Sequence, residues 1–173
     1  MVNKPPPRPI KIVGGIGIVP LTQGFEAIID ASDVSLVGQY NWQVYSTNAK
    51  TKYASRGAWV DGKATTQKMH RLIMGDADGL LIDHINRNGL DNRRSNLRFC
   101  TAAQNAWNVS ERTTNTSGFR GVDYHKLSQK WQARTSKNGQ REYIGCYDTM
   151  EEAMSAYRQA VMVLHGEFYP TGE

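Results

Sequence analysis

The sequence predicts an α+β protein made of two small domains, and three observations carry that prediction. The chain has 173 residues, a length that suits one ordinary domain or two small ones. Short β-favouring runs separated by Gly and Asn fill much of it. Residues 109–117 are polar except for Val109, as is typical of a linker. We therefore expect one domain over residues 11–108 and a second over residues 118–170.

Charge and composition narrow the choice of partner and compartment. Lys and Arg number 21 against 16 Asp and Glu, a formal net charge of +5, which favours a polyanionic partner. No apolar run approaches the roughly 20 residues of a membrane span, and residues 1–9 lack the apolar centre of a secretory signal. Cys100 and Cys146 have no CxxC partner, which argues against a disulfide framework and a structural zinc. We expect an intracellular protein with no membrane partner.

The first half of the chain predicts an extended arm followed by a small antiparallel sheet. Residues 1–10 hold four of the six prolines, which neither enter a helix nor donate to a sheet. Residues 30–39 are expected to hold a short helix, and residues 65–73 a strand or another short helix. The predicted strands cover residues 16–19, 25–29, 42–45 and 53–60.

Residues 80–108 predict a strand, a loop, a second strand and a short helix. Residues 80–82 are an apolar strand, and residues 97–99 offer a return strand. Thr101 and Gln104 form a capping box, which starts a helix that reaches Trp107 or beyond.

Polar residues in this segment suggest a hydrolytic site. A carboxylate oxygen of Asp83 and an amide oxygen of Asn105 suit one hard divalent cation, with water and phosphate oxygens as its other ligands. His84, if neutral near pH 7, can take a proton from water, and Asn96 can accept the proton of its other ring nitrogen and fix the tautomer. An Asp-His pair alone is more often a surface hydrogen-bonded pair.

The spacing of these residues resembles that of the HNH nucleases, which have the ββα-metal (His-Me finger) fold. Asn96 lies twelve residues after His84, and Asn105 lies nine residues further on. The resemblance covers residues 66–108 and is closest to the phage and intron-encoded group, in which the final metal ligand is Asn. The phrases that carry it are Met69-His70-Arg71-Leu72-Ile73, Asp83-His84-Ile85-Asn86 and Asp91-Asn92-Arg93-Arg94-Ser95-Asn96-Leu97-Arg98.

This resemblance implies a homing-type endonuclease that hydrolyses double-stranded DNA with one Mg²⁺ or Mn²⁺ ion and no zinc. It implies that His84 is the general base and Asn96 its orienting residue, that Asp83 and Asn105 bind the metal, and that the products carry 5′-phosphate and 3′-hydroxyl ends. The expected setting is the cytoplasm of a bacterial or phage-infected cell.

Basic residues around the same loop either bind DNA phosphates or are simply exposed to solvent. Of these we expect Arg93 and Arg94 to contact DNA.

The second domain is predicted to be a three-stranded sheet backed by one helix. Asn138-Gly139 joins the last two strands as a hairpin turn, and Thr149 with Glu152 forms a capping box for a helix to about His165. The predicted strands cover residues 119–125, 130–137 and 140–147.

Charge is segregated within this domain. Residues 119–141 carry six Lys or Arg against one Asp, whereas residues 142–173 carry one Arg against six acidic residues. A basic free face of the sheet, with Tyr124, Trp131 and Tyr143 interleaved, suits a nucleic acid as readily as it suits plain solvation.

This second domain resembles the AP2/ERF-type DNA-binding domain over residues 117–170. The matching segments are Gly118–Val122, Lys130–Arg134, Tyr143–Tyr147 and Thr149–Tyr157. The resemblance implies that the sheet enters the major groove, and the residues expected to contact DNA are Arg120, Arg134, Arg141 and Tyr143. Asp123 and Tyr143 depart from the residues of plant members, so base preference is not carried over.

Two alternatives stay open at this point. One is a non-catalytic DNA-binding regulator with a decayed nuclease fold, which the four suitable residues of the predicted metal site disfavour. The other is a structure-specific nuclease for branched DNA, which the sequence does not separate from the first hypothesis. We expect a monomer or weak dimer, in which a monomer nicks DNA and a dimer can cut both strands.

Overall fold

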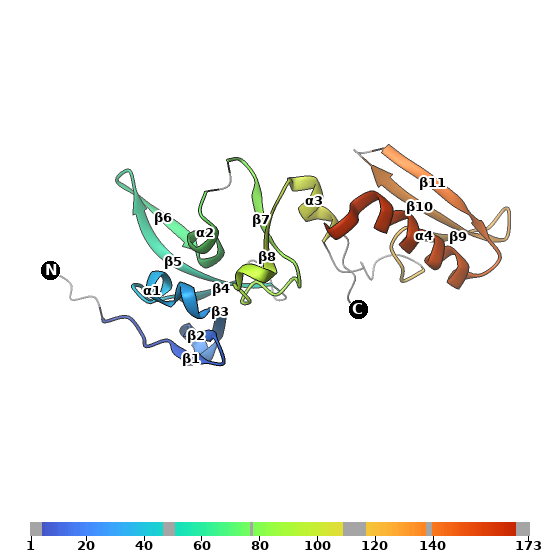
Figure 1. The fold of residues 1–173 in the computed structure, drawn as a ribbon. Coiled ribbons are helices and arrows are strands. Elements are labelled where there is room, and N and C mark those ends of the chain that lie inside the picture. The colour runs from blue at the N-terminus through green and yellow to red at the C-terminus, as the bar shows by residue number, and fades with distance from the viewer. Residues whose placement is uncertain (1–4, 47–50, 77, 109–116, 138–139, 169–173) are drawn as a thin grey trace. The chain divides into compact units, whose positions relative to one another are not determined.

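The protein divides into two compact units, which are described separately here (Figure 1). The computed structural model describes residues 5–46, 51–76, 78–108, 117–137 and 140–168. The units are Met1–Thr101 and Ala102–Glu173. This boundary precedes the expected linker at 109–117, of which only Ser117 is described, so the expected domain limits stay a prediction. Among the described residues, no helix is long and apolar enough to cross a membrane.

Two three-stranded antiparallel sheets make up most of the first unit, in the orders β1-β2-β3 and β4-β5-β6. Every β-favouring run predicted in this part of the chain overlaps one of these strands, but the prediction of a single small sheet missed the division into two. The strands are β1 (Lys11–Val13), β2 (Ile16–Pro20), β3 (Glu26–Asp30), β4 (Gln43–Ser46), β5 (Lys52–Val60) and β6 (Lys63–Lys68).

Two short helices accompany these sheets. The helix expected within residues 30–39 is a 3₁₀ turn, Ala31–Asp33, continued by α1 (Val34–Val37). The segment 65–73, expected to be either strand or helix, is both: β6 ends at Lys68 and α2 (Met69–Met74) follows at once.

One hydrophobic core joins these elements. Trp42 is buried, and its indole Nε1 donates to the Val37 carbonyl oxygen at 2.9 Å, which satisfies the one polar atom of the ring. Side chains from both sheets, both helices and β8 (Leu97–Cys100) share the cluster. Its buried members are Val19, Leu21, Ala27, Ile29, Val37, Trp42, Ala54, Met69, Ile73 and Leu97.

The described part of the proline-rich arm is hydrogen-bonded to the first unit. Arg8 donates to the carbonyl oxygens of Pro20 and Trp42 at 2.9 and 3.0 Å, and Asn41 donates to the carbonyl oxygens of Pro5 and Pro6. Residues 5–10 form no helix or strand, as expected from the prolines, and side-chain hydrogen bonds hold them in place.

An antiparallel pair, β7 (Leu81–His84) and β8, follows the second sheet. The loop between the two strands docks onto β3, because the amide of Ile28 donates to Leu90 at 2.9 Å and the amide of Asn92 donates to Ile28 at 2.7 Å. Backbone bonds therefore set the position of Asn92 close to the end of β7.

The second unit contains a three-stranded antiparallel sheet, in the order β11-β10-β9, with helix α4 packed on it. The strands and the helix lie in the segments where the sequence predicted them, and the predicted turn at 138–139 lies outside the described residues. Their bounds are β9 (Val122–His125), β10 (Lys130–Lys137), β11 (Gln140–Tyr147) and α4 (Met150–His165), and the short helix α3 (Ala102–Trp107) precedes them in this unit.

Helix α4 begins where the capping box predicted. The Thr149 hydroxyl accepts from the Glu152 amide at 3.2 Å, and the Glu152 carboxylate accepts from the Thr149 amide at 3.3 Å. Ala153, Tyr157 and Val161 form the buried stripe of the helix, as their helical spacing requires.

Alternation along β10 decides which side chains face α4. Ala133 is buried against the helix, so Arg134 points to the opposite face, where Tyr143 is its cross-strand partner. Trp131 packs against the core, and the edge of the Tyr124 ring meets it at a centroid distance of 5.3 Å. The expectation that Tyr124 and Trp131 interleave with the basic residues is therefore wrong, because both lie on the helix side. Tyr143 remains on the free face.

Candidate functional site

Asp83 and His84 lie at the end of β7, and both are buried, with 7% and 5% of their surface exposed. They pair with Arg98 and Leu97 of β8, respectively. Adjacent residues of a strand point to opposite faces. The Asp83 carboxylate and the His84 imidazole therefore contact different neighbours.

The Asp83 carboxylate is held by Arg98, its cross-strand partner. Nη2 and Nε of Arg98 donate to Oδ2 of Asp83 at 2.8 and 3.1 Å. Both side chains are largely buried, with exposed fractions of 8% and 11%, so the guanidinium provides the charge compensation that a buried carboxylate needs. A sequence signal for this pair existed, because pairing the two predicted strands brings residues 83 and 98 together.

The His84 ring is held by Asn92. Nε2 of His84 and Oδ1 of Asn92 are 3.3 Å apart, and because an amide oxygen can only accept, this contact places the ring proton on Nε2. Burial lowers the pKa of His84 below its ordinary value, although the hydrogen bond to Asn92 and the charges of Asp83 and Asp91 oppose that shift. The imidazole is therefore neutral near pH 7, with its lone pair on Nδ1.

A second histidine packs against the first. The rings of His70 and His84 meet edge to face at a centroid distance of 4.9 Å, and Tyr53 lies 5.9 and 5.8 Å from the two rings. Burial, aided by the charges of nearby basic groups, lowers the pKa of His70 to about 3. A neutral His70 and Tyr53 therefore both pack against the His84 ring. The sequence did not predict this contact between His70 and His84.

Asn96 has a different role from the expected one. Its side-chain oxygen accepts from the Asn86 amide at 2.9 Å, and its Nδ2 donates to Oδ1 of Asn86 at 3.0 Å and to the Asp91 carbonyl at 2.8 Å. These bonds hold the loop after β7, and the residue that contacts the His84 ring is Asn92. Nothing in the sequence separates Asn92 from the other asparagines of this loop.

Arg93 and Arg94, the predicted DNA contacts of this unit, are engaged with carboxylates. Nε and Nη2 of Arg93 donate to Asp91 at 2.8 and 2.7 Å, and those of Arg94 donate to Asp33 at 3.0 and 2.7 Å. Both acceptors are buried. Each arginine thus compensates a buried acid, and the predicted contact with DNA would have to compete with these bonds.

Asn105, the other predicted metal ligand, is exposed on α3 and belongs to the second unit. Among the described residues, no group of three or more His, Cys, Asp or Glu side chains lies together as a metal cluster. A cation at Asp83 would therefore take most of its ligands from amide oxygens, water and substrate, a donor set that suits Mg²⁺.

The predicted DNA contacts of the second unit lie on or beside the free face of the sheet. Arg134 forms an ion pair with Asp123, and Tyr143 is 62% exposed. Arg141 is the cross-strand partner of Ser136. Arg120, which precedes β9, lines a pocket together with Arg134 and Arg141.

Comparison with known proteins places this site in a family. A family model described as HNH endonuclease matches residues 68–107, from the last residue of β6 to the end of α3. Protein 3.8 of Escherichia phage T7 is 32% identical over 90 residues, which cover 52% of this chain and 74% of that protein. The uncharacterized HNH endonuclease L560 of Acanthamoeba polyphaga mimivirus is 27% identical over 146 residues, which cover 84% of this chain and 74% of that one.

The protein is thus an enzyme of the nuclease class. It belongs to the HNH endonuclease family. A solved structure on DNA binding and cleavage by the HNH homing endonuclease I-HmuI aligns with 89% of this chain and 86% of its own at 22% identity, with a TM-score of 0.33. A score of this size does not establish a common overall arrangement.

Proposed function

We propose that this endonuclease hydrolyses double-stranded DNA with His84 as the general base, in a reaction that depends on one Mg²⁺ or Mn²⁺ ion. The observation that carries the proposal is the His84 ring, buried next to Asp83 and held through Nε2 by Asn92. A neutral imidazole with a fixed tautomer is the form that accepts a proton from water at pH 7.

In the proposed reaction, Nδ1 of His84 takes a proton from a water molecule, whose oxygen attacks phosphorus. The bond from phosphorus to the 3′ oxygen breaks, which leaves a 5′-phosphate and, after the leaving oxygen is protonated, a 3′-hydroxyl. Asn92 keeps the ring from rotating, and His70 and Tyr53 limit the water around it.

Asp83 and Asn105 are the proposed metal-binding residues, since both offer hard oxygen donors. When bound, a divalent cation supplies positive charge that stabilises the developing charge on the phosphate and on the leaving oxygen. Oδ2 of Asp83 already accepts from Arg98, so metal binding competes with this guanidinium for that oxygen.

The second unit is proposed to bind DNA as an AP2/ERF-like domain. The support is the free face of its sheet, where Arg134 and Arg141 lie with the exposed ring of Tyr143, together with the sequence resemblance. Weak contacts from two modules on one duplex add through effective concentration. The homing-type role and the monomer or weak dimer are proposed from the resemblance to the phage and intron-encoded group.

Incubation with supercoiled plasmid tests the catalytic proposal. We expect relaxed or linear product with Mg²⁺ or Mn²⁺ and none with EDTA. His84→Ala should lower the cleavage rate by at least about a thousandfold, the combined scale of general-base catalysis, while DNA binding stays within twofold. His125→Ala, a change of the same kind on β9, serves as the control and should keep the cleavage rate at saturating protein.

Failure of the wild-type protein to cut any DNA with any divalent ion would favour the non-catalytic regulator. Cleavage confined to branched substrates would favour the structure-specific nuclease. Sequencing of the cut ends identifies the target and shows whether one strand or both are broken.

A further inference from the structure

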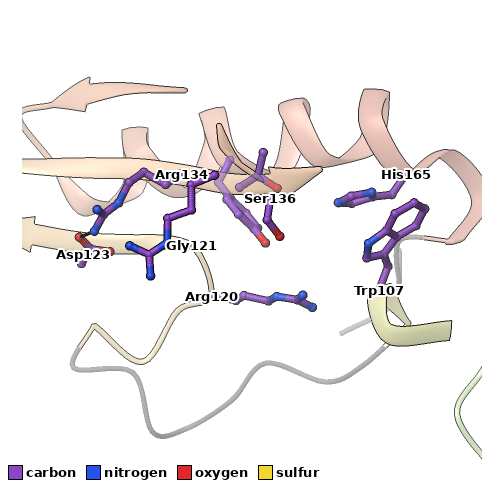
Figure 2. Close-up of a pocket in the computed structure, with 10 residues that line it drawn as sticks. Trp107, Arg120, Gly121, Asp123, Arg134, Ser136 and His165 are labelled. Carbon is purple, nitrogen blue, oxygen red and sulfur yellow. Dashed lines mark hydrogen bonds and ion pairs between the residues drawn. The ribbon is translucent and has the colours of Figure 1, made fainter. Parts of the chain in front are cut away.

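A pocket of about 270 Å³ opens beside β10 in the second unit (Figure 2). It forms because β9 pairs with β10 only from Lys130 to Ala133, so the following residues of β10 lack a neighbouring strand on that side. The chain before β9 approaches instead, and the amide of Arg134 donates to the Gly121 carbonyl at 2.7 Å. Thr135 and Ser136 line the pocket at this open edge.

The pocket carries an excess of positive charge. Three arginines line it against one carboxylate, Asp123, which forms an ion pair with Arg134. The side chains of Arg120 and Arg141 have no hydrogen bond or ion pair within the part of the chain that the structure describes. Two guanidinium groups from different segments therefore line one pocket, and neither is paired with a carboxylate among the described residues. Figure 2 shows Arg120 extending toward the side formed by Trp107 and His165.

His165 gives a second, independent sign of a ligand. Only 8% of its surface is exposed, and its buried Nδ1 has no hydrogen-bond partner among the residues that the structure describes. Its ring stacks on Trp107 at a centroid distance of 4.1 Å, which fixes its position at the pocket wall. A buried polar atom is rarely left unpaired, because the missing bond costs about 1–3 kcal/mol. Such an atom beside two unpaired arginines indicates that a polar ligand completes the pocket.

We propose that this pocket binds a phosphate group, held by Arg120 and Arg141 with Ser136 and His165 as further polar contacts. Guanidinium groups match phosphate oxygens by charge and by their forked geometry, and charge-assisted bonds to phosphate are about twice as strong as neutral ones. The pocket lies at the open edge of β10 and shares Arg120, Arg134 and Arg141 with the residues proposed to contact DNA. The phosphate can come from a DNA backbone, in which case this inference rests on the proposed DNA binding, or from a free mononucleotide or inorganic phosphate.

The first arm of the test titrates the full chain with inorganic phosphate, with potassium chloride at equal ionic strength as the reference. The readout is the imidazole ¹H–¹⁵N NMR signal of His165, assigned as the signal that His165→Gln removes. We expect a saturable shift with phosphate and none with chloride. Arg120→Gln and Arg141→Gln should each weaken the phosphate affinity by on the order of tenfold.

The second arm measures duplex binding in EDTA across a range of potassium chloride concentrations. If a backbone phosphate occupies the pocket, each variant lowers the slope of log K against log salt by about one, and the duplex shifts the His165 signal. Arg158→Gln is the control: it removes the same charge from α4, where Arg158 packs over the Phe119 ring, and should leave the slope unchanged. Thermal midpoints establish that every variant folds.

The arms separate the two sources. Saturable phosphate binding with unchanged slopes supports the site and assigns it to a free phosphate or mononucleotide, whereas slopes that fall only in Arg120→Gln and Arg141→Gln support the duplex as the source. No saturable phosphate shift together with unchanged slopes overturns the proposal. A wild-type protein that binds no DNA would refute the proposed function, and the phosphate arm would still decide the pocket.

Discussion

The two units use arginine in opposite ways. In the first unit, Arg93, Arg94 and Arg98 each donate two hydrogen bonds to an aspartate that is itself buried. In the second unit, Arg134 is paired with Asp123, but the guanidinium groups of Arg120 and Arg141 line the same pocket with no acidic partner among the described residues. The difference teaches that a basic segment near a catalytic loop need not be a DNA-binding segment. An arginine whose donors already bond to a buried carboxylate has fewer donors left for a phosphate.

The largest effect on stability is expected at Arg98, because both side chains of its ion pair with Asp83 are largely buried. Arg98→Met leaves the buried carboxylate of Asp83 without its partner, and breaking a buried ion pair in this way costs about 3–5 kcal/mol of unfolding free energy. Urea denaturation of the first unit measures it. Arg158→Met, an exposed arginine on α4, should change stability by less than about 0.5 kcal/mol. Equal stabilities for the two variants would show that Arg98 does not compensate Asp83.

Asn92 and Asn96 offer the next test, because only one of them contacts the His84 ring. Asn92→Leu keeps the shape of a fully buried side chain but removes the acceptor of Nε2, so cleavage should fall about 10–100-fold, the usual cost of losing such a supporting bond. The thermal midpoint and the DNA affinity should change little. Plasmid cleavage under single-turnover conditions measures the loss.

Asn96→Leu, in contrast, should destabilise the fold of the protein. It removes three hydrogen bonds that hold the loop after β7, at about 1 kcal/mol each, so it should lower the thermal midpoint as well as the cleavage rate. If Asn96→Leu instead abolished cleavage at an unchanged midpoint while Asn92→Leu cleaved normally, the original assignment of Asn96 as the orienting residue would stand.

Acid should destabilise the first unit through His70. His70 has a pKa of about 3 when folded and about 6.5 when unfolded, so between these values the unfolded chain binds the extra proton. Its contribution is complete above about pH 6.5 and falls by roughly 1.4 kcal/mol per pH unit below it. Differential scanning calorimetry from pH 7 to pH 5 measures this loss.

His70→Leu is the comparison variant for that experiment. It removes the titrating group and should flatten the pH dependence of the first transition, although the lowered pKa of His84 leaves part of it in place. An unchanged pH dependence in His70→Leu would mean that His70 is not the source of the acid sensitivity.

The smallest effect on DNA binding is expected for Arg93 and Arg94, because both already donate hydrogen bonds to aspartates. Arg93→Gln and Arg94→Gln should leave the salt slope of DNA binding within about 0.3 of the wild-type value, against about one for an arginine that contacts a phosphate. Filter binding across a salt series gives the slopes. A drop of one unit for either variant would show that its guanidinium exchanges aspartate for phosphate, and the contrast between the two units would then fail.

The strands and helices were largely predictable because their signals are local. The capping box at Thr149 and the apolar spacing along α4 need only neighbouring residues to act. The same holds for the strands of the second unit, whose turn and β-favouring runs lie next to one another in the chain. The face of the sheet on which Trp131 lies was not predictable in this way. It could be assigned only once the structure showed that Ala133, two residues along the same strand, is buried against the helix.

The proposed catalytic pair was also visible in the sequence, since Asp83 and His84 are adjacent and the spacing to Asn96 and Asn105 is distinctive. The partners of these residues were not visible. Arg98 reaches Asp83 through strand pairing, and Asn92 reaches His84 because backbone bonds dock its loop on β3.

The sequence by itself therefore determined the order of the helices and strands, the position of the nuclease segment, and the presence of Asp83 and His84 in that segment. Each of these depends only on residue type and on spacing over a short stretch of chain. Only the tertiary structure decided which polar group each of them meets. It assigned Arg93 and Arg94 to buried acids, Asn92 to the His84 ring, and His165 to a pocket with Arg120. The physical reason is that hydrogen bonds and ion pairs extend over only a few ångströms, so distant segments must pack before these partners can meet.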